Sequence, residues 1–569
     1  MCTERIPAPP DTAGTGVKAR EARFRCGRSS TQRIMLHDHA AAIKDTDTFN
    51  TMAILNKIVD AGAPIGPMAI VVVFLGAILT HQLSLVVYNL FFHPLRSIPG
   101  PLLSRATPWP WALRQAVGVQ AFYTHRQHEK YGPVVRIGPN HLSFTDPRAW
   151  KDIYGHRTGG EKDGSHQLEM SKSRVTASPI DALPTTIVNS DKEEHQRLRR
   201  AMSHGFSDAS IRSQEPLIMK YVDKLISGLE THCKEGKPLN IEAWYNWTTF
   251  DVVGDLVFGL SFGCLDKFQY NPWVHSMLAS IKYGATMSGM IYVGWNRFVQ
   301  LFFRFVGSKS IKQLKKYTND MVVSRLNLTQ ERNDLFEGIV KKQAEWKMSF
   351  EQLSANAEIL VLAGSETTAT LLSGCTYLLL TNPDKMEKLK HEVRSAFASD
   401  SEITASSVNK LSYMLGALNE ALRLYPPVTS SLVRVVPPGG DMIADHWVPE
   451  GTMVECQHWS MNHSPENWTE PWAFKPERFL EDVPGDKLEA LQAFSVGPRN
   501  CIGRNLAYVE MRIILARLIY NFDLRLAEDS HRWIERQRSY ALWARIPLHC
   551  YLTRVSPIPR EQPLPTVSE

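Results

Sequence analysis

The sequence lacks the features of several common protein classes. Its eight cysteines lie far apart and form no C-x-x-C pair, which disfavours a zinc ribbon or a thioredoxin-like site and fits reduced thiols in a cytosol-facing protein. Sixty-four basic against 58 acidic residues leave a net charge of only +6, too small to indicate a nucleic-acid partner. The chain also contains no flavin or dinucleotide motif. Hydrophobic content of 43% in 569 residues nevertheless supplies a large core.

Charge is absent from one long stretch near the N-terminus, residues 61–95. Within it, residues 68–92 would form a helix of about 37 Å, against a hydrocarbon core of about 30 Å. A buried core helix is the alternative, but Thr80, His81, Gln82 and Asn89 suit a core poorly. The sequence therefore predicts a single-pass transmembrane anchor over 61–92.

The anchor divides the chain into unequal parts. Residues 1–60 are polar and arginine-rich, and we expect a disordered extension or an untranslated leader; a mitochondrial presequence is the alternative, opposed by its acidic residues. A proline-rich hinge over 93–101 follows, and then one catalytic domain over 102–555 without repeats or linkers. The tail over 556–569 is proline-rich and expected to be extended.

Hydrophobic periodicity predicts a mainly α (α+β) domain. Helices are expected at 216–233, 244–260, 311–326, 351–380, 383–398, 407–424 and 503–521. Short strands are expected at 133–137, 141–145, 431–436 and 452–456.

One cysteine occupies a special context, the segment Phe494–Gly503, which reads FSVGPRNCIG and leads into a periodic helix. Helix N-terminal N–H groups and the cation of Arg499 would favour a thiolate at Cys501, as a metal ligand requires. Gly497 and Gly503 would let the backbone approach a large flat group. A buried free cysteine and a nucleophilic thiolate are the alternatives.

The pattern F-x-x-G-x-R-x-C-x-G resembles the haem-ligand loop of the cytochrome P-450 family at every fixed position. This resemblance implies the cytochrome P-450 fold, a large helical domain with small sheets around a buried haem b (iron protoporphyrin IX). It makes Cys501 the axial ligand of the iron, with Phe494 and Gly503 in the cofactor-binding loop.

A second motif, Ala363-Gly-Ser-Glu-Thr-Thr368, lies in the middle of the long apolar helix. In the family this is the oxygen-activating site, so the resemblance makes Glu366 and Thr367 an acid–alcohol pair that relays protons. It also implies that Gly364 leaves room for oxygen and that Ala363 faces the pocket. A threonine bonded back to its own helix is the ordinary alternative.

Further residues match the family in the expected order. Glu420 and Arg423, three apart on one helix, together with Arg478 resemble a structural network that braces the haem loop. The alternative is an exposed ion pair that contributes little to stability. For the two haem propionates, the resemblance and the preference of arginine for carboxylates select Arg499, His195, Arg199 and Arg434.

The resemblance implies a monooxygenase that takes NADPH-derived electrons from an NADPH–cytochrome reductase, with cytochrome b5 as a further candidate partner. It also implies a single-pass protein of the endoplasmic reticulum membrane with a cytosolic catalytic domain. The segment 88–101 and the turn at 437–440 resemble fungal secondary-metabolism members such as isotrichodermin hydroxylases, and so imply a lipophilic terpenoid or polyketide substrate. A haem–thiolate isomerase and a non-enzymatic haem sensor are the alternatives, against which Glu366-Thr367 and the four ordered motifs count.

Overall fold

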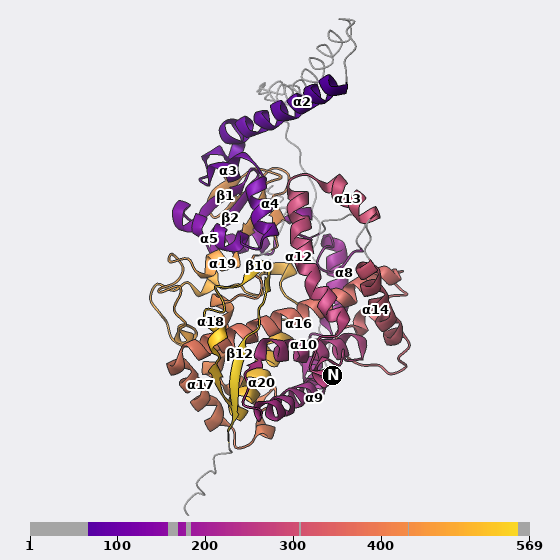
Figure 1. Cartoon of the computed structure of the whole chain (residues 1–569), viewed down its shortest axis with the longest axis vertical. Coiled ribbons are helices and arrows are strands. Elements are labelled where there is room, and N and C mark those ends of the chain that lie inside the picture. The colour runs from indigo at the N-terminus through magenta and orange to yellow at the C-terminus, as the bar shows by residue number, and fades with distance from the viewer. Residues whose placement is uncertain (1–66, 158–168, 178–183, 306–308, 431, 556–569) are drawn as a thin grey trace, which may run out of the picture. The chain divides into compact units, whose positions relative to one another are not determined.

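The computed structural model describes residues 67–157, 169–177, 184–305, 309–430 and 432–555. The predicted extension over 1–60 and the predicted tail over 556–569 lie outside these residues. The chain divides into two compact units, the second of which begins at Leu83. This second unit is mainly helical with small sheets, as the sequence predicts (Figure 1).

The charge-free stretch forms helix α2 (Pro67–Val87), which continues through a π-helical turn, Tyr88–Phe92. The 26 residues Pro67–Phe92 are long and apolar enough to cross a membrane. No residue of α2 is buried, so its apolar side chains are available to lipid. The described part of the predicted span therefore agrees with a single transmembrane anchor.

The proline-rich hinge predicted over 93–101 packs against a strand that follows it in the chain. Pro94–Ser97 form a short 3-10 turn, and the chain then runs along strand β1 (Val134–Gly138). Arg136 N donates to Pro99 O at 2.8 Å, and a Cβ on Gly100 would lie 2.3 Å from Arg136 O. Because this close approach fixes the segment on β1, residues 93–101 belong to the second compact unit.

The predicted helices are present with boundaries shifted by a few residues, except that the first begins eight residues earlier. They are α9 (Asp208–Cys233), α10 (Ile241–Phe258), α14 (Lys309–Leu326), α16 (Phe350–Thr381), α17 (Pro383–Ala396), α18 (Ser412–Leu424) and α20 (Arg504–Asn521). The expected helix over 407–424 is interrupted, because Ser407–Lys410 form a separate 3-10 turn.

The structure adds helices that the periodicity did not single out. The longer ones are α4 (Trp109–Ala116), α5 (Gln120–Tyr131), α6 (Arg148–Tyr154), α8 (Lys192–Ser203), α12 (Pro272–Tyr292) and α13 (Asn296–Phe305). The shorter ones are α3 (Leu102–Ala106), α7 (Arg174–Ala177), α11 (Cys264–Lys267), α15 (Glu337–Lys342) and α19 (His458–Asn462).

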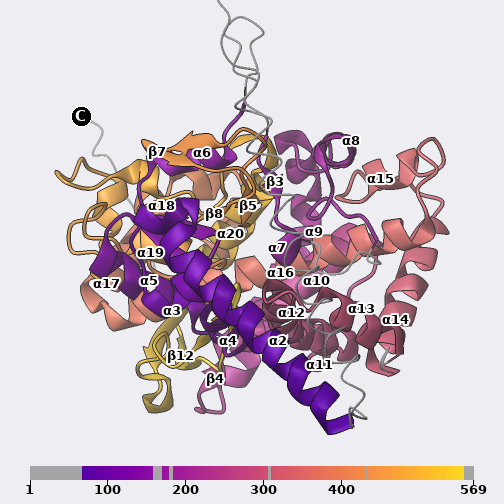
Figure 2. The ribbon, with the colours of Figure 1, turned by 90° about the horizontal axis from the view of Figure 1, so that it is seen from above.

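The largest sheet has the strand order β1-β2-β8-β5-β3 and contains all four predicted strands. Its other members are β2 (His141–Phe144), β8 (Met453–Cys456), β5 (Arg434–Val435) and β3 (Ser171–Lys172). Figure 2 shows β3, β5 and β8 side by side. Smaller sheets pair β4 (Leu239–Asn240), β12 (His549–Arg554) and β9 (Phe522–Leu526), β6 (Asp441–Ile443) with β7 (His446–Val448), and β10 (Arg538–Tyr540) with β11 (Leu542–Ala544).

Helix α16 occupies the centre of the core and packs on α10, α18 and α20. Its start is set by a capping box, in which Ser349 Oγ accepts from Gln352 N and Gln352 Oε1 accepts from Ser349 N. This packing places the middle of α16 and the first turn of α20 in one region of the fold.

Candidate functional site

Cys501 lies between the 3-10 turn Gly497–Arg499 and the first turn of α20. Its backbone N–H donates to Phe494 O at 2.9 Å, which closes the loop on itself. Of the six cysteines in the described residues, Cys501 is the one with an exposed side chain; the others are buried or half-buried. The loop therefore presents this sulfur rather than packing it away.

The electrostatics at Cys501 differ in part from the sequence expectation. Desolvation by the surrounding protein raises the pKa of the Cys501 thiol, while the Gly503 N–H and the cations of Arg199 and Arg504 oppose that rise. The expected cation, Arg499, points elsewhere: its Nε donates to Glu169 Oε1 at 2.5 Å and its Nη1 to Ser190 O at 3.0 Å. The groups that favour the thiolate are thus the Gly503 N–H, Arg199 and Arg504, and the expected Arg499 is not among them.

Arg199 contacts the cysteine loop directly. Its guanidinium donates to Asn500 O at 2.6 Å and to Asn500 Oδ1 at 2.5 Å. The two residues predicted on one face of α8 therefore make different contacts. Arg199 holds the loop next to Cys501, whereas His195 is buried beside other cations.

A cluster of buried and half-buried cations surrounds His195. Burial and repulsion by Arg499, Lys172, Arg199 and Arg434 lower the pKa of His195 to about 3. Burial and repulsion by Arg499 and Arg434 lower the pKa of Lys172 to about 7. Within the described residues, Arg434 Nε and Nη1 are buried and have no hydrogen-bond partner. So many cations in one place indicate an anion-binding site.

Lys172 is the member of this cluster that the sequence did not identify. It pairs with Arg434 in the ladder of β3 and β5, so the two side chains are brought together by strand register. Its Nζ donates to Ile187 O at 3.3 Å and also to Val188 O. A single lysine in a segment without periodicity carries no local signal, which is why sequence reasoning could not find it.

The donor set fits a haem group. The loop presents one accessible sulfur. Among the described residues, Glu169 is the acidic side chain paired with the cation cluster, so the cluster can also accept two carboxylates. A Cβ on Gly503 would lie 3.6 Å from Phe206 Cε1 and 4.0 Å from Cys501 Sγ, both ordinary contacts, so close packing against these atoms does not require a glycine here.

The middle of α16 presents two predicted residues to open space. Ala363 is exposed and Thr367 half-buried, one turn apart on one helix face. Thr367 Oγ1 donates to Ala363 O at 2.7 Å, the back-bonded arrangement expected of a helical threonine.

Gly364 packs against a neighbouring helix, and its predicted role of leaving room for oxygen stays a prediction. A Cβ on this glycine would lie 3.1 Å from Val253 Cγ2 on α10, so the missing side chain allows α10 and α16 to pack closely. Likewise a Cβ on Gly497 would lie 2.0 Å from Tyr154 O, and Gly497 has a φ of +75°. Both glycines therefore allow close protein packing, and the approach to a bound group predicted for Gly497 stays a prediction.

Glu366 is buried and does not share the direction of Thr367. Its Oε1 accepts from Arg545 Nη2 at 2.7 Å, and burial raises its pKa against the opposing effect of Arg545. Sequence reasoning missed Arg545 and its second carboxylate neighbour, Glu242, because both lie far from Glu366 in the chain.

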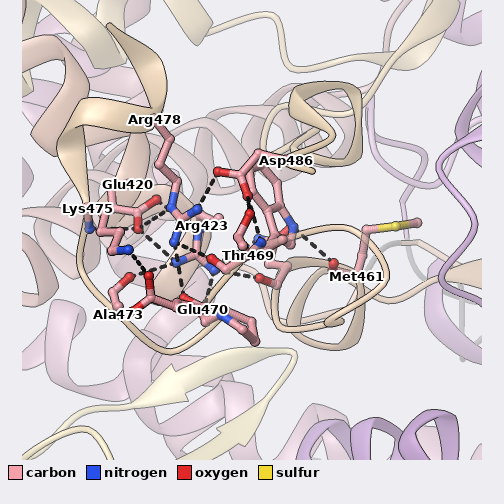
Figure 3. Close-up of polar contacts among 12 residues, drawn as sticks. Glu420, Arg423, Met461, Thr469, Glu470, Ala473, Lys475, Arg478 and Asp486 are labelled. Carbon is pink, nitrogen blue, oxygen red and sulfur yellow. Dashed lines mark hydrogen bonds and ion pairs between the residues drawn. The ribbon is translucent and has the colours of Figure 1, made fainter. Parts of the chain in front are cut away.

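The predicted structural network assembles in full (Figure 3). Arg423 Nε and Nη2 donate to the two oxygens of Glu420, each at 2.8 Å, and Arg478 Nε donates to Glu420 Oε1 at 3.0 Å. All three side chains are at most 1% exposed. Arg423 also donates to the carbonyls of Asn462, Pro471 and Ala473, and Arg478 to those of Thr469 and Glu470. The network therefore holds the loop over 462–475 in place. It is not the exposed ion pair that was the alternative.

Comparison with known proteins identifies the family. The cytochrome P450 family model matches residues 101–550. The chain is 46% identical over 473 residues to cytochrome P450 monooxygenase tpeC of Talaromyces stipitatus, covering 82% of this chain and 91% of that protein. It is 42% identical over 490 residues to trichothecene C-15 hydroxylase of Fusarium sporotrichioides (84% and 96% covered), and 39% identical over 487 residues to averantin hydroxylase of Dothistroma septosporum (84% and 91% covered).

The chain belongs to the cytochrome P450 family and is a monooxygenase with the cytochrome P450 fold. The resemblance to fungal members is confirmed by these relatives. Membership implies a haem–thiolate cofactor, a redox partner that supplies electrons and a lipophilic substrate.

Proposed function

We propose that Cys501 is the axial ligand of haem iron. Phe494 and Gly503 shape the loop around this sulfur, and Arg199 holds the loop through Asn500. His195, Arg434, Arg499 and Lys172 bind the two propionates, with Arg199 next to them. The single observation that carries this proposal is the accessible sulfur of Cys501 next to a cluster of poorly neutralised buried cations.

The reaction is the insertion of one oxygen atom of O₂ into a lipophilic small molecule. Haem bound through a thiolate supplies the cleavage of the O–O bond. The chain's own part is to orient the substrate beside Ala363 and to handle protons at Thr367 Oγ1 and the Glu366 carboxyl. Both residues lie in the middle of α16, so one helix carries the proton chemistry.

Two electrons for each turnover come from NADPH through an NADPH–cytochrome reductase, with cytochrome b5 as a further partner. The named activities of the relatives, trichothecene C-15 hydroxylase and averantin hydroxylase, support a fungal secondary metabolite of terpenoid or polyketide type as the substrate.

The protein is anchored in the endoplasmic reticulum membrane by the span ending at Phe92, with its catalytic domain in the cytosol. The apolar, unburied helix α2 supports the anchor, and the free thiols of the catalytic domain suit a reducing compartment.

The carbon monoxide difference spectrum of the reduced protein tests the ligand assignment. We expect the red-shifted Soret band of a thiolate-bound haem, and we expect Cys501→Ser to abolish it. Cys233→Ser, at the end of α9, is the matched control and should retain the band. A Cys501→Ser protein that still shows the band would disprove the ligand assignment. Product formation without NADPH and reductase would favour the isomerase alternative.

A further inference from the structure

A group of three buried ionisable side chains lies on the face of α16 that carries Glu366. Arg545, just after β11, donates from Nη2 to Glu366 Oε1 at 2.7 Å and to Asn246 Oδ1 at 2.9 Å. Its Nε lies 3.5 Å from Oε1 of Glu242 on α10. The side chains of Glu366, Arg545 and Glu242 are 2%, 3% and 10% exposed. One guanidinium thus stands between two carboxyl groups.

Two polar atoms of this group have no partner in the protein. Within the described residues, Glu366 Oε2 and Arg545 Nη1 are buried and have no hydrogen-bond partner. A cavity of about 360 Å³ borders Glu242, Glu366 and Arg545 on one side and the exposed His275 and Lys282 on the other. Polar walls and a volume many times that of a water molecule make this cavity suitable for water.

The charges in the group do not balance if every member is ionised. Burial raises the pKa of Glu242 and of Glu366, and among the described residues Arg545 is the cation that lowers the pKa of each. Two carboxylates beside one guanidinium would leave one negative charge unpaired in a buried site, which is unfavourable. The titratable and charged groups that face the pair are Arg545, Tyr270, Tyr425, His275 and Lys282.

We propose that Glu242, Arg545 and Glu366 form a proton-storing triad that takes protons from the water-accessible cavity and passes them to α16. Arg545 holds one carboxylate ionised while the other carboxyl keeps its proton. In the transfer step, the O–H bond of the Glu242 carboxyl breaks and the proton crosses through water to the Glu366 carboxylate. A proton from bulk solvent, relayed by water in the cavity, then reprotonates Glu242. No electrons move in this step.

Glu242 and Arg545 are positioning residues for the proton chemistry, since they act through Glu366. The triad rests on the proposed role of Glu366 and extends it by naming the source of the proton. The segment after β11, near the C-terminus, brings Arg545 against α16, where its guanidinium pairs with the buried Glu366.

The test uses the full-length haem-loaded protein and the isosteric variant Glu242→Gln. We expect the infrared C=O band of a protonated carboxyl to titrate above the pH range of an ordinary glutamate, because burial raises the pKa of both carboxyls, to shift in D₂O, and to be lost in Glu242→Gln. With reductase, NADPH and oxygen, Glu242→Gln should lower the rate of NADPH oxidation about tenfold. This is less than the effect of removing a general acid or base itself, because Glu242 acts through Glu366. Arg545→Lys should shift the midpoint of the band.

Glu455→Gln provides the matched control, because burial raises the pKa of Glu455 to about 8 and this residue lies in β8, outside the cavity. It should remove a different carboxyl band and leave NADPH oxidation unchanged. If neither Glu242→Gln nor Glu366→Gln removes a titrating band, the triad is overturned. If Glu366→Gln alters oxidation while Glu242→Gln does not, the role of Glu366 stands and the triad fails. If Glu366→Gln and Thr367→Ala are both without effect, the proposed relay itself fails.

Discussion

At the scale of single residues, charge and its compensation distinguish the site from the rest of the core. Most buried ions in the described residues have partners; Arg423 and Arg478, for example, have a carboxylate and several carbonyls each. Within the described residues, Arg434 and Lys172 have no acidic partner in direct contact, and burial with repulsion by Arg499 and Arg434 lowers the pKa of Lys172. A residue whose charge is uncompensated by protein points to a ligand that compensates it.

Lys172 provides a direct test of that argument. Lys172→Met should release haem about 30-fold faster, corresponding to about 2 kcal/mol for a lost buried charge pair. Without a ligand, Lys172 loses its proton above pH about 7. Bound propionates would keep Lys172 protonated, so haem binding above that pH takes up a proton. Raising the pH above about 7 should therefore weaken haem binding, by at most about tenfold for each pH unit.

Haem transfer to an acceptor protein, followed by absorbance, measures both effects. Arg148→Met is the control, because the Arg148 side chain is 62% exposed and already paired with Asp146. A Lys172→Met protein with unchanged haem release and an unchanged pH slope would contradict a propionate contact.

At the scale of elements, the structural network joins α18 to the loop that precedes the cysteine. Glu420 and Arg423 are one turn apart on α18, and they contact Arg478 in the 3-10 turn Pro476–Phe479. Lys475 N also donates to Glu420 Oε1 at 3.0 Å. These contacts fix backbone carbonyls that no regular ladder satisfies, so the loop holds its shape without being a helix or a strand.

Removal of Arg423 should therefore be severe. Arg423→Met leaves Glu420 buried with one cation fewer and frees the carbonyls of Asn462, Pro471 and Ala473, at an expected cost of about 3–5 kcal/mol. We expect a large fall in the thermal unfolding midpoint and in the fraction of protein that incorporates haem, both measurable in purified protein.

The control is an ion pair of the same spacing on the surface. Lys342 and Glu345 lie three apart, with side chains 47% and 60% exposed. Lys342→Met should change stability by less than about 1 kcal/mol. Equal effects of the two substitutions would mean that the Arg423 contacts contribute no more than a surface pair.

At the scale of the whole molecule, the second compact unit begins before the end of the apolar span. Arg136, which is buried, donates from Nη1 to Asn89 O at 2.9 Å and from Nε to Pro139 O at 2.9 Å. Asn89 Nδ2 in turn donates to Ala106 O at 2.9 Å. The last turn before the proline-rich segment is thus part of the catalytic unit's structure.

Truncation separates the anchor from this structural role. A chain that begins at Leu83 should lose most of its membrane association yet unfold close to the temperature of the full chain. A chain that begins at Leu102 should unfold several degrees lower, because Arg136 loses the carbonyls of Asn89 and Leu95 and becomes a poorly satisfied buried cation. Sedimentation with membranes and thermal unfolding measure the two effects, and equal unfolding temperatures would assign 83–101 to a free linker.

Local spacing alone determined the helical class, the apolar span and the order of the four motifs, since each depends on residues within about a turn or two of one another. The loop around Cys501 and the pair Glu420–Arg423 are of this kind. The tertiary structure decided the rest: strand register brings Lys172 to Arg434, and packing brings Arg545 to Glu366 and Val253 to Gly364. These partners lie far apart in the chain, and no local pattern in the sequence encodes which distant residues will meet when the chain folds.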